Sequence, residues 1–94
     1  MYYVYIIQSL ADGTYYTGIT GNLEKRLIHH NSEQFNKGIT KRKSPWKYFF
    51  VLEVNNRSKA LRIEKHIKRM KSRIYIQNLK KYPEIAKKLI NKYS

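Results

Sequence analysis

The chain has 94 residues and no cysteine, and its twenty lysines and arginines against six acidic residues give a net charge of +14. This length allows one domain with one modest core, and the lack of cysteine excludes disulfides and thiolate chemistry and disfavours a structural zinc site. The charge favours a polyanion such as nucleic acid as partner, and the absence of a signal peptide and of an apolar run of about 18 residues predicts a cytoplasmic protein with no membrane partner.

A β-hairpin is predicted for residues 3–18. Two runs rich in Tyr, Val, Ile and Thr flank an Asp-Gly pair, which supplies the positive-φ residues of a tight turn. Side chains alternate along a strand, so one face of the first strand is formed by Tyr3, Tyr5 and Ile7. In the same way, one face of the second strand is formed by Tyr16, Gly18 and Thr20. The phenols of Tyr5 and Tyr16 converge only if the register puts these two faces on the same side, which the sequence leaves open.

A short helix is predicted for residues 22–31. Asn22 is a suitable N-cap, Glu24 suits the positive end of the helix dipole, and Asn31 is an acceptable stop. Arg26 and His30 are four residues apart, so they share one helix face beside the apolar stripe. We therefore expect both side chains to lie along the sheet.

Residues 32–45 are polar, show no period and are predicted to form a loop. The segment contains the cationic cluster Lys41, Arg42 and Lys43. Long loops without regular structure are often functional, and a solvated loop without a function is the alternative. Both interpretations stay open at this point.

The most apolar run of the chain, residues 46–54, is predicted to be a strand and the central one of the sheet. It is too short for a typical helix and is rich in aromatic and β-branched residues. A turn then leads into a helix over residues 59–71, whose core-facing stripe is formed by Ala60, Ile63, Ile67, Met70 and Ile74. Glu64 lies on this stripe, and a buried carboxylate requires a cationic partner or a metal.

The C-terminal segment is predicted to be helical over residues 74–81 and again over 83–93, where Pro83 suits the first turn. The predicted elements therefore follow the order β-β-α-β and then helices, which we summarise as β-β-α-β-α-α. It predicts an α+β fold with a small sheet flanked by helices, in a single domain with a core at about 2–72 and a helical extension at about 73–94.

The polar residues suit the cleavage of phosphodiesters. A divalent cation on Glu64 would polarise the phosphate, the Arg26 guanidinium would bind the developing charge, and a phenol near cations would have its pKa lowered from about 10 so that it could help to move a proton. Each residue also has a structural interpretation. The tyrosines can be sheet aromatics, and Glu64 can form a salt bridge with Arg26.

Several motifs in order resemble the GIY-YIG nuclease superfamily, and most of all the small stand-alone bacterial proteins related to the nuclease domain of the excinuclease C subunit. The resemblance covers about residues 2–72. It is carried by Val4-Tyr5, Tyr16-Thr17-Gly18, the segment from Gly21 through Arg26 to His30-Asn31, Ser-Pro-Trp-Lys at 44–47, and Ala-Leu-Arg-Ile-Glu at 60–64. Tyr3 and Thr17 depart from the motif, which has glycine and isoleucine at these positions.

The resemblance implies a three-stranded antiparallel sheet between helices and metal-dependent hydrolysis of DNA, with one Mg²⁺ or Mn²⁺ ion. It implies that Tyr5 or Tyr16 is the general base, that Arg26 contacts the phosphate and that His30 assists. Glu64 would be the metal ligand, and a further family asparagine corresponds loosely to Asn78.

The predicted contacts to nucleic acid are basic residues of the loop, the third strand and the following helix: Lys41, Arg42, Lys43, Lys47, Lys65, Lys68 and Arg69. The function predicted is a DNA endonuclease of low sequence specificity, in repair or processing, acting on duplex, branched or damaged DNA and associated with the nucleoid. The alternatives are a non-catalytic module that binds DNA or RNA and a structural part of a ribonucleoprotein. A protein partner is not indicated by the sequence.

Overall fold

The computed structural model describes residues 1–32 and 43–93, and its centre is a three-stranded antiparallel sheet in the order β2-β1-β3. The strands are β1 (Tyr2–Ser9), β2 (Tyr15–Thr20) and β3 (Trp46–Val54). The prediction that residues 46–54 form the central strand is wrong, because β1 occupies that place. β1 is buried on both faces over residues 4–7, whereas β3 exposes Lys47, Val51 and Glu53 to solvent along its length.

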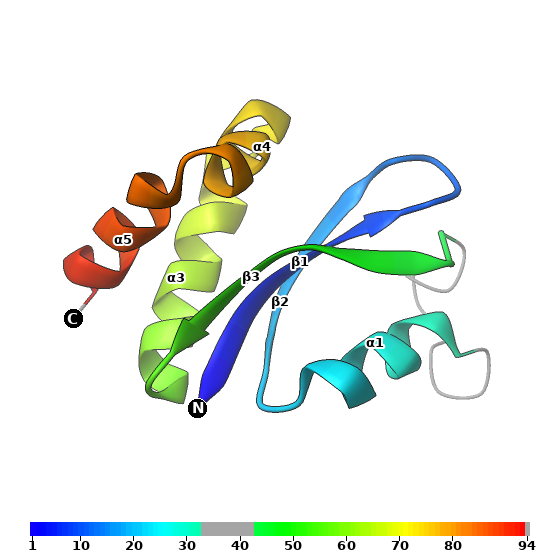
Figure 1. Cartoon of the computed structure of the whole chain (residues 1–94), viewed down its shortest axis with the longest axis horizontal. Coiled ribbons are helices and arrows are strands. Elements are labelled where there is room, and N and C mark those ends of the chain that lie inside the picture. The colour runs from blue at the N-terminus through cyan, green and yellow to red at the C-terminus, as the bar shows by residue number, and fades with distance from the viewer. Residues whose placement is uncertain (33–42, 94) are drawn as a thin grey trace.

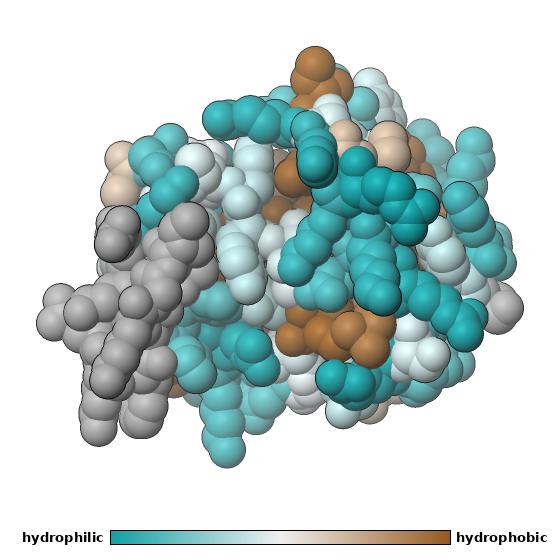
Figure 2. Space-filling view, turned by 180° about the vertical axis from the view of Figure 1, so that it is seen from behind, coloured by the Kyte–Doolittle hydropathy of each residue, from teal (hydrophilic) through white to brown (hydrophobic). Residues whose placement is uncertain are grey.

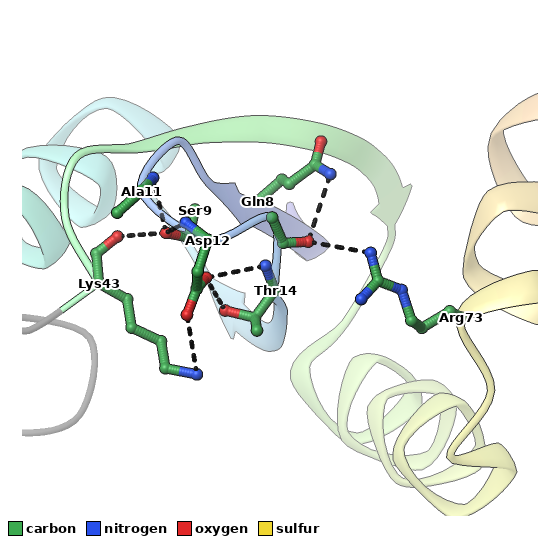
Figure 3. Close-up of polar contacts among 8 residues, drawn as sticks. Gln8, Ser9, Ala11, Asp12, Thr14, Lys43 and Arg73 are labelled. Carbon is green, nitrogen blue, oxygen red and sulfur yellow. Dashed lines mark hydrogen bonds and ion pairs between the residues drawn. The ribbon is translucent and has the colours of Figure 1, made fainter.

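The predicted hairpin forms, but residues 10–14 join its strands instead of a tight turn with positive φ at both Asp12 and Gly13, because only Gly13 of these two is left-handed. Figure 3 shows the polar contacts of Asp12 in this turn. Gly13 has a φ of 78°, and the carboxylate of Asp12 accepts hydrogen bonds from the backbone N–H and the hydroxyl of Thr14. This turn sets a register in which Tyr5 pairs with Gly18 and Ile7 with Tyr16. The two predicted faces therefore coincide, and the phenols of Tyr5 and Tyr16 lie on the same side of the sheet.

The helices are α1 (Leu23–Asn31), α3 (Arg57–Met70), α4 (Arg73–Lys81) and α5 (Pro83–Lys92). Figure 1 shows α3, α4 and α5 grouped together, with α1 apart from them. Asn22, Asn56 and Ser72 cap the first three of these helices by accepting a hydrogen bond from a backbone N–H of the first turn. The predicted α+β fold is confirmed, and the sheet is followed by three helices rather than the two of the summarised order.

Two hydrophobic clusters lie on opposite faces of the sheet. Val4 and Ile6 pack with the buried stripe of α3 and with residues of α4 and α5, while Tyr5 and Ile7 pack with Trp46 and the apolar side of α1. Alternation along β1 thus supplies both clusters. In the described chain, no helix is both long and apolar enough to cross a membrane.

The predicted core stripe ends earlier than expected. Ala60, Ile63 and Ile67 are buried, but Met70 is 45% exposed and Ile74 is 69% exposed. Lys71 adopts the left-handed conformation and ends α3, so Ile74 belongs to a different helix with a different axis. The helical period therefore does not continue through residue 74.

Candidate active site

One cleft of about 470 Å³ brings together four of the predicted site residues. Tyr5 comes from β1, Tyr16 from β2, Arg26 from α1 and Glu64 from α3, and all four line the same cleft. The elements that carry them are separated by up to about sixty residues in the chain, so only the fold makes them neighbours. Arg57, at the start of α3, adds a second guanidinium to this lining.

Tyr5 is buried where it lines this cleft. Its side chain is 1% exposed, its hydroxyl lies 2.8 Å from Nε2 of His30, and its ring packs edge-on against that of Tyr48. Gly18 is directly opposite Tyr5 in the sheet, and a Cβ at that position would lie 2.5 Å from the Tyr5 hydroxyl oxygen. Residue 18 must therefore be glycine for the phenol to take this position.

The Tyr5–His30 pair is uncharged at neutral pH. Burial raises the pKa of the Tyr5 phenol above its ordinary value, although the neighbouring Arg26 guanidinium acts in the opposite direction. The expectation that nearby cations lower the pKa of a phenol is therefore wrong for Tyr5. Burial, assisted by the positive charges of Arg26 and His29, lowers the pKa of His30 to about 4.

Tyr16 is half-buried and lies between α1 and α3. Its ring packs edge-on against His30, with 5.3 Å between the ring centroids, and Nζ of Lys68 lies 5.8 Å from the Tyr16 ring centroid. His30 thus contacts both tyrosines of the cleft. The structure places His30 behind the two phenols, where it is 7% exposed.

Glu64 has the cationic partner that its position requires. Its side chain is 15% exposed, and Oε2 lies 3.5 Å from Nζ of Lys68, one helical turn further along α3. The sequence allowed a salt bridge with Arg26 instead. Within residues 1–32 and 43–93, no ion pair joins Glu64 to Arg26.

The donors present fit a weakly held divalent cation. Among the described residues, no three His, Cys, Asp or Glu side chains form a group that could hold a metal by themselves, and Glu64 is the single carboxylate in the lining of the cleft. A hard cation such as Mg²⁺ is often held by one or two carboxylates and completes its shell with waters and phosphate oxygens. Glu64 can supply that carboxylate.

Comparison with known proteins gives the family of the chain. The family model of the GIY-YIG catalytic domain matches residues 1–82. The chain belongs to the GIY-YIG family. This is a family of nucleases of the endonuclease type, and its substrates are nucleic acids.

The curated relatives are UPF0213 proteins, whose names state no activity. One from Syntrophus aciditrophicus is 40% identical over 87% of this chain and 93% of its own length. Others from Desulfotalea psychrophila and Halobacterium salinarum are 38% and 34% identical over 73% and 74% of this chain, and over 62% and 88% of their own lengths. No solved structure matches the chain significantly.

Three residues that the sequence analysis did not assign to the site hold this GIY-YIG cleft in shape. Gly18 makes room for Tyr5, as above, and the Tyr48 hydroxyl donates to the backbone carbonyl of Leu23, 2.5 Å away. The Asn31 amide accepts from the backbone N–H of Trp46 and donates to its carbonyl, so it joins the end of α1 to β3. A glycine inside a strand signals a close approach and could have revealed Gly18. Asn31 belongs to a motif that carries the resemblance, but no local signal predicts its bonds to Trp46 or the bond of Tyr48 to Leu23.

Asn78 is not brought to the cleft. It lies on α4, half-buried, and does not belong to the lining that the structure describes. Its backbone carbonyl accepts from Tyr82 at the end of the helix. A role for Asn78 in a GIY-YIG site thus has no geometric support.

The predicted basic residues are distributed over several elements. Lys47 is exposed on β3, and Lys65, Lys68 and Arg69 are exposed on α3. Lys43 is half-buried, and its Nζ lies 3.4 Å from the Asp12 carboxylate, so this lysine links the segment before β3 to the hairpin turn (Figure 3). Lys41 and Arg42 lie outside the described residues.

Proposed function

We propose that the protein is a divalent-metal-dependent endonuclease that hydrolyses DNA phosphodiester bonds with low sequence specificity, in repair or processing of DNA in the cytoplasm. The observation that carries the proposal is the meeting of two phenols, a guanidinium and a carboxylate in one cleft, from four different elements. A protein that only binds nucleic acid has no need of this combination. The family membership makes nucleic acid the substrate class.

The phosphate binds at Arg26. This residue is exposed on α1 and also lines the cleft, so its guanidinium can form a bidentate contact with phosphate oxygens and stabilise charge that develops on them. Arg57 lines the same cleft and offers a second contact. Both contacts act in the ground state as well as in the transition state.

Tyr5 acts through its hydrogen bond to His30. The neutral imidazole accepts a hydrogen bond from the phenol at Nε2, so the lone pairs of the phenol oxygen can accept a hydrogen bond from the attacking water. Tyr5 thus holds the water in place, and the proton of the water leaves to a phosphate oxygen of the substrate or to solvent, because the lowered pKa of His30 makes its imidazole a poor proton acceptor. This route does not require a phenolate, which the raised pKa of Tyr5 disfavours.

Glu64 is the residue that would hold one Mg²⁺ or Mn²⁺ ion. The bound ion would supply a Lewis acid that polarises the phosphate and steadies the leaving oxygen. Lys68 pairs with the Glu64 carboxylate and would give way to the ion, since the lysine side chain is 51% exposed and has room to move.

Exposed cations outside the cleft would bind the rest of the DNA through its phosphates. Lys65 and Arg69 project from α3, the helix that carries Glu64, and Lys47 projects from β3. On the face seen in Figure 2, hydrophilic side chains cover most of the surface, and hydrophobic atoms show in separate patches between them. Contacts to phosphates carry no sequence information directly, so low specificity and a steep salt dependence follow.

The test is incubation of the purified protein with supercoiled plasmid and with flap, branched and single-stranded oligonucleotides, with Mg²⁺, with Mn²⁺ and with EDTA. We expect strand cleavage that requires a divalent ion and that shows little preference among duplex sequences. Binding without cleavage of any of these substrates would contradict the proposal.

A non-catalytic module that binds DNA or RNA is the second candidate, and the Glu64–Lys68 ion pair favours it. This pair already neutralises the carboxylate without a metal. If the module only binds, Glu64→Gln should leave the affinity for nucleic acid unchanged and there should be no cleavage to lose. Comparison of DNA and RNA oligonucleotides of one sequence then identifies the preferred ligand.

A further inference from the structure

A second groove of about 410 Å³ lies between β2 and the junction of α3 with α4. Its walls include the rings of Tyr15 and Tyr16, and Ile67 and Ile76 add apolar surface. Tyr16 also lines the cleft described above, so the two cavities share one wall. The proposed nuclease site does not use Tyr15 or the α3–α4 junction.

The charged side chains that line this groove are all positive. Lys68, Lys71 and Arg73 line it, and no carboxylate belongs to its lining among the described residues. Lys71 takes the left-handed conformation, with a φ of 46°, where α3 ends and Ser72 caps α4. Lys71 follows the last residue of α3 and Arg73 is the first residue of α4, and the sharp change of direction between the two helices brings both side chains to the groove.

Cations lie over both aromatic walls. The Arg73 guanidinium carbon is 5.5 Å from the centroid of the Tyr15 ring, and Nζ of Lys68 is 5.8 Å from that of Tyr16. Arg73 and Lys68 are exposed, so each can move aside for a ligand or remain over a base that enters. The groove therefore offers aromatic and guanidinium planes beside a row of positive charges.

We propose that this groove binds unpaired nucleotides of the substrate strand next to the phosphate held in the cleft. The proposal rests on the nuclease function proposed above and narrows its substrate to DNA with a single-stranded segment at the cutting site. Aromatic rings interleaved with cations are the usual surface for single strands, because bases stack on the rings while phosphates contact the cations. In an intact duplex the bases are stacked on one another, so the half-buried ring of Tyr15 would have no base to stack on it.

Continuity with the cleft supports this assignment. Lys68 pairs with Glu64 in the cleft and also lies over Tyr16 in the groove. A strand whose phosphate lies between Arg26 and Glu64 would pass Tyr16 and enter the groove directly. The bases beyond that phosphate must then be free of their complementary strand.

The proposal is tested by binding in EDTA, so that cleavage plays no part. Fluorescence anisotropy compares a labelled hairpin duplex that carries an unpaired tail with a fully paired hairpin of the same number of phosphates. We expect the wild-type protein to bind the tailed hairpin about tenfold more tightly, as stacking of one base allows. Equal affinities for the two hairpins would overturn the proposal.

The double variant Lys71→Gln/Arg73→Gln should reduce that preference to about twofold. Its matched control is Lys87→Gln/Lys88→Gln on α5, which removes the same charge from exposed positions outside both cavities and should retain the preference. If both double variants weaken both hairpins equally, the groove is only part of a general phosphate-binding surface and the proposal fails.

A second measurement reports on stacking directly. With 2-aminopurine in the tail, the wild-type protein should quench its fluorescence on binding, and Tyr15→Leu, which keeps an apolar side chain, should quench it less. Unchanged quenching in a Tyr15→Leu protein that melts as the wild type does would contradict the proposal. A protein that prefers the tail but never cuts DNA would retain this inference and refute the nuclease function, so the two can fail separately.

Discussion

The two faces of the sheet are built from one strand but differ in chemistry. On the α3 side, Val4 and Ile6 join an aliphatic cluster that includes Ile63. On the α1 side, Tyr5 and His30 bury a hydrogen-bonded phenol and imidazole. Burying polar groups costs free energy unless they are paired, so this second face is stabilised less by its packing and relies on hydrogen bonds such as the one between Tyr5 and His30.

Because of this difference, the residues that stabilise the fold are not the residues that form the cleft, although the domain is too small for two independent cores. The aliphatic face provides most of the burial, and the polar face positions the groups that line the cleft. Ile63 and Glu64 are adjacent in α3, yet Ile63 is fully buried in the aliphatic cluster while Glu64 lines the cleft. Substitutions at these positions should therefore have opposite effects on folding and on cleavage.

The largest effect is expected for Glu64→Gln. This change keeps the size of the side chain and removes its negative charge, so the metal ion loses its protein ligand. The rate of metal-dependent cleavage should fall about a thousandfold or more, because a metal ion stabilises the transition state by several kcal/mol. Thermal melting and DNA affinity should stay close to wild type. Cleavage near the wild-type rate would show that Glu64 serves only in its ion pair with Lys68.

Ile63→Ala should do the opposite. Truncation of a fully buried isoleucine typically costs about 2–5 kcal/mol of unfolding free energy and should lower the melting temperature by at least about 8 °C. Cleavage per folded molecule should be unchanged, as measured at a temperature where the variant is folded. The matched control is Ile74→Ala, because Ile74 is 69% exposed and its truncation should change stability by less than about 0.5 kcal/mol.

Tyr5→Phe tests whether the phenol on the α1 side of the sheet serves cleavage or only packing. Loss of the hydroxyl removes one hydrogen bond, worth about 1 kcal/mol of stability, but should slow cleavage about a hundredfold while the DNA-binding curve stays the same. Tyr3→Phe on the same face of β1 is the control and should cut normally. A Tyr5→Phe protein that cuts at the wild-type rate would assign the phenol to packing alone.

The smallest effect concerns the pH dependence of stability. The pKa of His30 is about 4 in the folded protein and about 6.5 in an unfolded chain, so the unfolded state binds the extra proton between these values. Stability should therefore fall as the pH is lowered from 7 to 4.5, and His30→Gln should remove part of that fall. The two proteins should respond alike between pH 7 and 8, and identical acid dependence would show that His30 is not shielded from water.

Much of the fold follows from local sequence signals. The turn at Gly13, the cap at Asn22 and the apolar run of β3 could be predicted because each depends on neighbours within a few residues. The place of β3 in the sheet could not be predicted, because an apolar run does not show which strand of a sheet will be covered on both faces. The exposure of Ile74 was missed because the left-handed Lys71 interrupts a period that the residue types continue.

The sequence by itself determined which chemical groups are available and the order of the motifs that identify the family: the phenols of Tyr5 and Tyr16, the guanidinium of Arg26 and the carboxylate of Glu64. Only the tertiary structure decided that the four line one cleft, that Lys68 is the partner of Glu64, and that the pKa of Tyr5 is raised rather than lowered. The physical reason is that strand register and burial depend on contacts between residues far apart in the chain. An electrostatic environment is the sum of such contacts, and it has no counterpart in the local spacing of residues.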